Sequence, residues 1–82
     1  EHGKPAPDLY LHAAERLSVD PAYSIAVEDS IHGIESASTA GMQVVQLRQA
    51  TFVPAPQASA SAVISSFGDF SHDWLDRGIT VD

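Results

Sequence analysis

With 82 residues, the chain is long enough for one small domain, which buries only a modest share of its surface. Its net charge of −7 and its four Lys and Arg residues argue against nucleic-acid binding, because few cations can contact phosphates. The absence of cysteine excludes disulfides and is compatible with a reducing compartment, so we expect a cytoplasmic protein. No apolar run approaches the roughly 20 residues of a bilayer span, so we expect no membrane partner.

The first predicted helix runs from Asp8 to Leu17, after an entry loop at residues 1–7. Pro7 suits the first turn of a helix, where its missing N–H costs nothing, and Asp8 favours the positive end of the helix dipole. Apolar residues at helical spacing predict its buried face: Leu9, Ala13, Ala14 and Leu17, with Tyr10 beside them. The turn residues at 18–21 end this helix.

A short strand at residues 24–27 and a second helix at residues 31–40 are predicted next. The apolar residues of the strand are consecutive, which is typical of a parallel strand covered on both faces. Ser30 can cap the helix by accepting a hydrogen bond from a free backbone N–H. Small residues every four positions predict a helix face that lies close to a sheet: Gly33, Ala37 and Gly41, of which Gly41 also suits a helix end.

The remaining elements are a second strand around Val44, Val45 and Leu47, a loop at residues 48–61 and a third strand at residues 62–64 near an edge. A helical turn at residues 67–75 carries Phe70 and Trp74, which we interpret as packing residues. The order α-β-α-β-loop-β-α predicts an α/β fold with three α/β/α layers around a parallel sheet.

Two adjacent carboxylates, Glu28 and Asp29, come between the first strand and the second helix. Lys4 precedes the first helix, which carries the chain roughly 15 Å away at 1.5 Å per residue. The strand returns it by a similar distance, so we expect Lys4 and the carboxylates at one edge of the sheet. That edge, at the carboxyl ends of parallel strands, is where open α/β sheets bind ligands.

Carboxylates and a lysine at one edge suit magnesium-dependent phosphoryl transfer. Mg²⁺ prefers oxygen ligands and keeps several waters, and a lysine neutralises a phosphate. Phosphoryl transfer needs mainly such positioning and charge stabilisation. Each motif also has a simpler interpretation: Glu28-Asp29 as a cap that complements the helix dipole, and Lys4 as a solvated loop residue. A hydrolytic triad of Ser30, His32 and Asp29 is not expected, because residues this close on one helix start cannot form the required hydrogen-bond chain.

The segments Gly3–Asp8, Val27–Ala37 and Ala40–Met42 resemble the haloacid dehalogenase-like hydrolases, and most closely their sugar-phosphate phosphatase and β-phosphoglucomutase-like branch. The resemblance runs from Gly3 to about Leu47. It implies that the chain is the carboxy-terminal part of a Rossmann-like core. It also implies that Lys4 binds the transferring phosphoryl group and the nucleophilic carboxylate.

For the acidic loop, the resemblance implies that Asp29 is a direct Mg²⁺ ligand, with Lys4 and Asp29 as the catalytic residues. Glu28 would bind the metal directly or through water, and Ser30 and Gly33 would shape the loop and helix start. The family's Asp-x-Asp nucleophile, its second phosphate-binding motif and its cap domain have no match here. We therefore expect residues 1–82 to need a missing N-terminal part, and to be inactive and poorly stable or self-associating alone.

Three functions stay open at this point. The first is a Mg²⁺-dependent phosphatase that hydrolyses a small phosphorylated metabolite, expected to be a sugar phosphate, through an aspartyl-phosphate. The second is a phosphomutase of the same family, which only cap residues would separate from a phosphatase. The third is a non-catalytic α/β binding module in which the acidic loop serves only as a helix cap.

Overall fold

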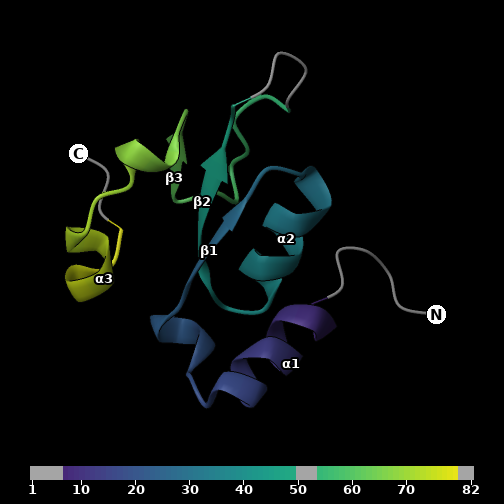
Figure 1. Cartoon of the computed structure of the whole chain (residues 1–82). Helices are drawn as coiled ribbons and strands as arrows, with labels where there is room; N and C mark the ends of the chain where they lie inside the picture. The colour runs from purple at the N-terminus through teal and green to yellow at the C-terminus, as the bar shows by residue number, and fades with distance from the viewer. Residues whose placement is uncertain (1–6, 50–53, 80–82) are drawn as a thin grey trace.

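The computed structural model describes residues 7–49 and 54–79 of the chain. Within these ranges the elements alternate as predicted (Figure 1). In chain order they are α1 (Asp8–Leu17), a 3-10 turn (Pro21–Tyr23), β1 (Ile25–Glu28), α2 (Ile31–Thr39), β2 (Gln43–Leu47), β3 (Ala62–Ile64), a 3-10 turn (Phe67–Asp69) and α3 (Asp73–Arg77). No helix in the described part is long and apolar enough to cross a bilayer.

The three strands form one parallel sheet in the order β1-β2-β3. This confirms the predicted α/β fold class with a parallel sheet and places β3 at an edge. The first strand lies one residue later than predicted, because Glu28 is still paired with Gln46 of β2. Glu28 is therefore the last residue of the strand and not the first residue after it.

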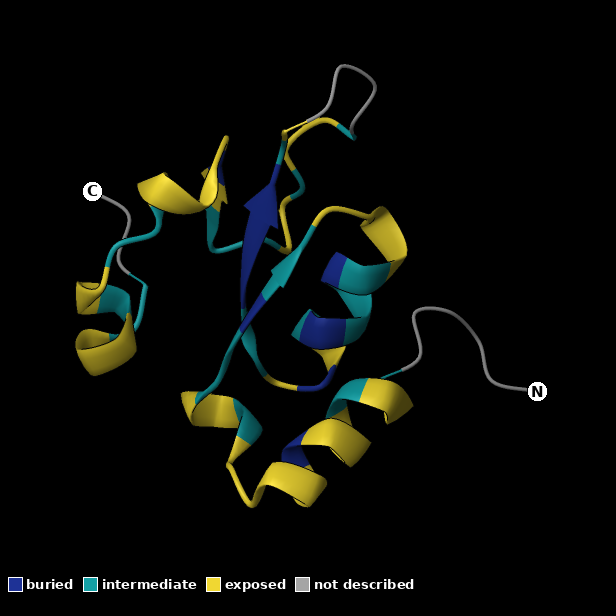
Figure 2. Ribbon diagram, viewed as in Figure 1, coloured by how far each residue is buried: buried dark blue, intermediate teal, exposed yellow. Residues whose placement is uncertain are grey.

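Each face of the sheet has its own apolar core (Figure 2). On one face, Ala26 and Val44 pack against Ile34 and Ala37 of α2. On the other, residues from β2 and β3 pack with residues that follow the sheet: Val45, Leu47, Ile64, Phe70 and Trp74. Consecutive apolar residues in β1 and β2 are explained by this double coverage, since successive side chains point to opposite faces.

The buried face of α1 is narrower than predicted. Ala14 is buried and Tyr10 packs against the core beside α2, but Leu9 and Leu17 are 74% and 72% exposed. Figure 1 shows the reason: α1 lies against α2 and does not reach the sheet. A contact between two helices covers only one row of side chains, so the predicted apolar face is mostly open to solvent.

The small residues of α2 do not form one packing face as predicted. Ala37 is fully buried, but Gly41 is exposed and lies beyond the helix, where its φ of 93° makes the predicted helix end. The prediction for the C-terminal segment was also too simple, because extended backbone at Phe70 separates the 3-10 turn from α3. The Phe70 and Trp74 rings pack edge to face with centroids 5.0 Å apart, which confirms them as packing residues.

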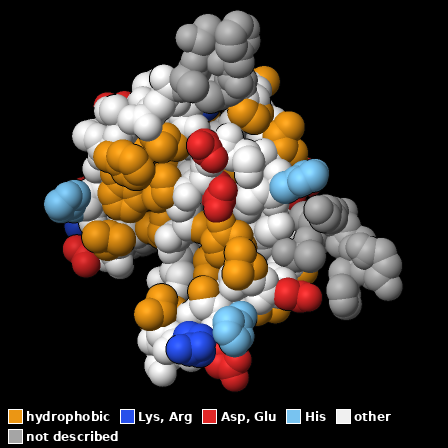
Figure 3. All heavy atoms as spheres, turned by 45° about the vertical axis from the view of Figure 1, so that its right-hand side comes forward, with side chains coloured by type: hydrophobic (Ala, Val, Ile, Leu, Met, Phe, Trp, Pro, Cys, Tyr) orange, Lys and Arg blue, Asp and Glu red, His pale blue; other side chains and the backbone are white. Residues whose placement is uncertain are grey.

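Several large apolar side chains remain exposed, among them Tyr23, Phe67 and Leu75. Figure 3 shows hydrophobic side chains gathered in patches on one face of the molecule, with acidic side chains between them. Strand β1 is an edge strand of the described sheet. Edge strands with apolar surroundings favour pairing with a further strand.

Candidate functional site

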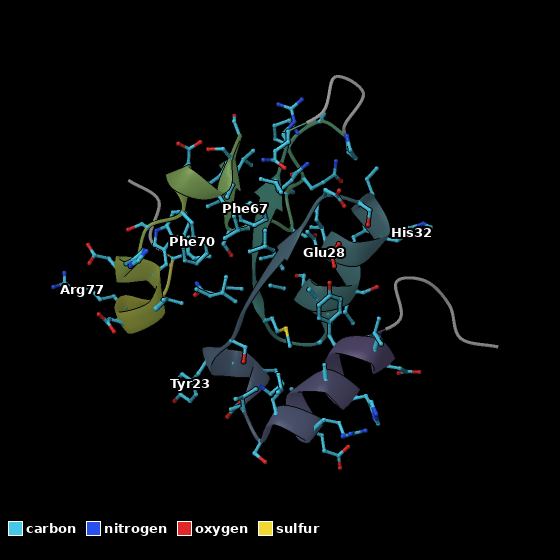
Figure 4. The ribbon with its side chains drawn as sticks, in the orientation of Figure 1. Tyr23, Glu28, His32, Phe67, Phe70 and Arg77 are labelled. Carbon is cyan, nitrogen blue, oxygen red and sulfur yellow. The ribbon has the colours of Figure 1, made fainter. Side chains whose placement is uncertain are left out.

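The acidic pair, Glu28 and Asp29, lies at the carboxyl-terminal edge of the parallel sheet. Glu28 closes β1, Asp29 and Ser30 form the turn, and α2 begins at Ile31. This is the carboxyl end of a parallel strand, the edge at which α/β sheets bind ligands. Figure 4 shows Glu28 between the end of β1 and the first turn of α2, with His32 pointing away from the sheet.

Ser30 fixes the turn between the strand and the helix. Its backbone is extended, with φ −113° and ψ 150°, and its Oγ accepts a hydrogen bond from the Gly33 N–H at 3.0 Å. The N–H of Ile34 donates to the Ser30 carbonyl oxygen at 2.9 Å. The predicted N-cap is thus confirmed, and because the Ser30 hydroxyl serves the cap, it does not serve the triad arrangement.

Gly33 makes room for the Glu28 carboxylate. A Cβ atom at position 33 would overlap that carboxylate and would lie 2.9 Å from Ser30 Oγ. Any larger residue would therefore displace either the carboxylate or the cap. The structure gives Gly33 a more specific task than shaping the helix start: it lets Glu28 lie against the first turn of α2.

The electrostatics of the pair match a place built for a cation. Partial burial raises the pKa of the Glu28 carboxyl above its ordinary value of 4.5, the nearby Asp29 charge raises it further, and a hydrogen bond from the Asp29 backbone lowers it. Asp29 itself is exposed. A divalent cation bound by these carboxylates would relieve their repulsion.

The described residues supply only part of a metal site. Within residues 7–49 and 54–79, no three His, Asp or Glu side chains gather closely enough to hold a metal. Glu28 and Asp29 are two oxygen donors, the usual protein contribution to a Mg²⁺ ion that keeps its waters. The residues present therefore fit Mg²⁺ as part of its ligand set. Lys4 lies outside the described residues, so its predicted approach to this edge stays a prediction.

A cavity of about 380 Å³ opens beside Asp29. Four consecutive residues of the acidic turn and α2 line it, Asp29 to His32, together with Pro54 from the loop after β2. His32 is exposed, as expected of a residue near the mouth of a site. The loop at residues 48–61 was predicted, but the place of Pro54 beside the candidate site was not. The signal in the sequence that could have indicated this contact is Gln46, a polar residue between the apolar residues Val45 and Leu47 of β2.

Comparisons with known proteins show which family the chain is similar to. The sequence model of the haloacid dehalogenase-like hydrolases matches residues 1–47. The chain is 41% identical to a probable pseudouridine-5'-phosphatase of Drosophila melanogaster over 84% of the chain and 31% of that protein. It is 44% identical to the fructose-1-phosphate phosphatase YqaB of Escherichia coli (58% and 26%), and 37% identical to a beta-phosphoglucomutase of Bacillus subtilis (89% and 30%).

Solved structures share the fold. The crystal structure of a HAD hydrolase from Entamoeba histolytica matches with a TM-score of 0.77 at 32% identity, covering 93% of this chain and 35% of that one. CbbY from Rhodobacter sphaeroides, solved in complex with phosphate, matches with a TM-score of 0.76 at 30% identity, covering 92% and 34%. The chain thus spans about a quarter to a third of the length of the proteins it matches.

Proposed function

The chain belongs to the haloacid dehalogenase-like hydrolase family, and from this membership we propose that it is part of a Mg²⁺-dependent phosphatase acting on a small phosphorylated metabolite. A sugar phosphate is the substrate class we favour, since relatives carry the names of a fructose-1-phosphate phosphatase and a beta-phosphoglucomutase. One observation supports the proposal most directly: the Glu28 carboxylate lies near Asp29 at the end of β1, in space that is free only because Gly33 has no side chain.

In this proposal the residues of the chain have separate tasks. Asp29, exposed at the edge of the sheet, is the direct Mg²⁺ ligand, and Glu28 binds the metal directly or through water. When bound, Mg²⁺ neutralises charge on the phosphoryl oxygens. Lys4 binds the transferring phosphoryl group. Ser30 and Gly33 keep the acidic turn in place, because the cap and the open space beside it fix both carboxylates.

The remainder of the chemistry belongs to residues outside this chain. We propose that residues 1–82 form the C-terminal portion of the core domain of a longer cytoplasmic enzyme. An aspartate elsewhere in that enzyme attacks phosphorus and expels the alcohol as the P–O ester bond breaks. Water then hydrolyses the aspartyl-phosphate and releases phosphate. The isolated chain is expected to have no phosphatase activity, because it supplies the metal-binding turn without the nucleophile.

Mg²⁺ titration of the chain, followed by amide chemical shifts, tests the metal site. We expect shifts centred on residues 28–33, abolished by Asp29→Ala and retained in Asp73→Asn, which removes an exposed carboxylate of α3. Equal Mg²⁺ binding by wild type and Asp29→Ala would reject the site and favour a non-catalytic module. In a longer protein that includes this chain, loss of phosphate-analogue binding in Lys4→Ala tests the phosphate role.

A phosphomutase is the second candidate, supported by the 37% identity to a beta-phosphoglucomutase over 89% of the chain. The same metal and phosphate ligands serve both reactions, because each begins with transfer of the phosphoryl group to an aspartate. The products separate them: a phosphatase releases inorganic phosphate, whereas a mutase returns the phosphoryl group to another hydroxyl of the sugar. Phosphate release from a sugar phosphate by the longer protein therefore decides between the two.

A further inference from the structure

Gln46 is a fully buried polar residue in the central strand, and its side chain holds the loop at residues 54–57. Its Nε2 donates to the carbonyl oxygens of Pro54 and Ala55 at 3.3 and 3.0 Å, and its Oε1 accepts from the Gln57 N–H at 2.7 Å. Arg48 Nε donates to the same Pro54 carbonyl at 3.0 Å. Four hydrogen bonds to the side chains of Gln46 in β2 and Arg48 just after it thus fix a loop that has no strand or helix of its own.

The position of Gln46 connects this loop to the candidate site. Gln46 is the register partner of Glu28, and residues paired in this way share a face of the sheet. Ala26 and Val44, two residues earlier in the same strands, lie on the same face, and α2 covers them. The loop, and not α2, covers this face of the sheet at Gln46. Pro54 of this loop lines the cavity beside Asp29.

We propose that Gln46 is a positioning residue that holds Pro54 as the wall against which the organic part of the substrate lies. This deepens the proposed function and rests on it. Pro54 and Ile31, on either side of the cavity, have no charge with which to bind phosphate or metal, so the wall suits the carbon skeleton of a compact phosphate monoester. Hydrogen bonds to the Gln46 amide hold Pro54 in place before binding, which lowers the ordering cost on association.

We call the hydrogen bonds between the Gln46 side chain and residues 54–57 the clamp. The clamp is tested without any ligand. Hydrogen exchange of the Gln57 amide should be slow in the wild type and fast in Gln46→Met, which keeps the side-chain length but removes the amide. Gln49→Met is the matched control, because Gln49 is exposed just beyond the same strand. Unchanged protection of Gln57 in Gln46→Met would overturn the clamp, whatever the function of the chain.

The role of the wall is tested in a longer protein that includes this chain, in the presence of Mg²⁺, by comparing the inhibition constant of inorganic phosphate with the KM of fructose 1-phosphate. Gln46→Met is expected to weaken fructose 1-phosphate about ten-fold relative to phosphate, a typical value for a lost packing contact in a pocket. Pro54→Ser should give the same selective loss with the clamp intact, because the clamp uses only the Pro54 carbonyl. It also covers the case in which Gln46→Met fails to fold.

The outcomes distinguish failure of the proposed wall at Pro54 from failure of the proposed phosphatase function. Equal weakening of both probes, or of neither, in Pro54→Ser overturns the wall while Mg²⁺ and phosphate binding by the wild type still support the proposed function. Failure of the wild type to bind Mg²⁺ and phosphate overturns the proposed function and the wall with it. A selective loss of fructose 1-phosphate in both variants, absent in Gln49→Met, supports the positioning role.

Discussion

Replacing Gly33 by Ala should weaken metal binding without unfolding the chain. In an ordinary helix the change is favourable by about 1 kcal/mol, because alanine loses less conformational freedom than glycine. Here the new Cβ would meet the Glu28 carboxylate and would lie 2.9 Å from Ser30 Oγ. The carboxylate is the end of a flexible side chain and can swing away, and the strained cap loses at most about 1 kcal/mol. The two stability effects nearly cancel.

Mg²⁺ affinity, unlike stability, has no compensating gain in this variant. Gly33→Ala displaces the Glu28 carboxylate from the first turn of α2, and if that carboxylate helps to bind the metal as we propose, Mg²⁺ affinity should fall about ten-fold, or about 1.4 kcal/mol. Urea denaturation measures the stability, and titration calorimetry or amide shifts measure the affinity. Gly68→Ala is the control, because a Cβ there meets only Ser66 Oγ at an ordinary 3.6 Å.

A double-mutant cycle shows whether the effect passes through Glu28. In a Glu28→Ala background there is no carboxylate to displace, so Gly33→Ala should no longer change Mg²⁺ affinity, while its effect on stability should stay near zero because the new Cβ still strains the Ser30 cap. Wild-type Mg²⁺ affinity in Gly33→Ala would refute this reasoning. So would a loss of stability well above 2 kcal/mol, since it would mean that backbone, and not a movable side chain, fills the space beside Gly33.

Three further predictions concern the rest of the molecule. Because the folded-state pKa of Glu28 is raised above 4.5, its charged form costs stability at neutral pH and the cost fades as pH falls toward 4.5. Without Mg²⁺, Glu28→Gln should therefore be more stable than wild type at pH 7 in denaturant titrations, and a difference that does not shrink on acidification would contradict this. Trp74→Ala should lower the free energy of unfolding by about 2 kcal/mol through loss of packing on Phe70, whereas Leu75→Ala, 68% exposed, should change it little. The apparent mass in sedimentation velocity should rise with concentration, since β1 is an edge strand; a monomer with a sharp, concentration-independent thermal transition would oppose this.

The parts of the fold that the sequence predicted best are those governed by local chemistry. Consecutive apolar residues placed β1 and β2 to within a residue, and Ser30 and Gly41 marked the two ends of α2. The predicted burial of Leu9 and Leu17 failed because periodicity reports which residues share a helix face and not how wide the contact is. The width depends on what lies opposite, which here is the single helix α2.

The candidate site divides along the same line. The carboxylates could be predicted because they stand at the end of a recognisable strand and precede a recognisable cap. The wall at Pro54 could not, because it depends on hydrogen bonds across eight to eleven positions between Gln46 and a loop without periodicity. A polar residue inside an apolar strand was the available clue: a buried amide must find partners, so its position predicts that some backbone will come to it.

Glu28 and Gln46 show how one strand register can serve both stability and chemistry. They are paired across β1 and β2 at the edge of the sheet where the first turn of α2 lies. Gln46 solves its burial with three hydrogen bonds to the loop, so its polar atoms are satisfied. Glu28 instead has a raised pKa, and its nearest charged neighbour is another carboxylate. Of these two polar groups, the Glu28 carboxylate, partly buried beside a like charge, is where a bound cation would gain most, and this supports the metal site that we propose at Glu28 and Asp29.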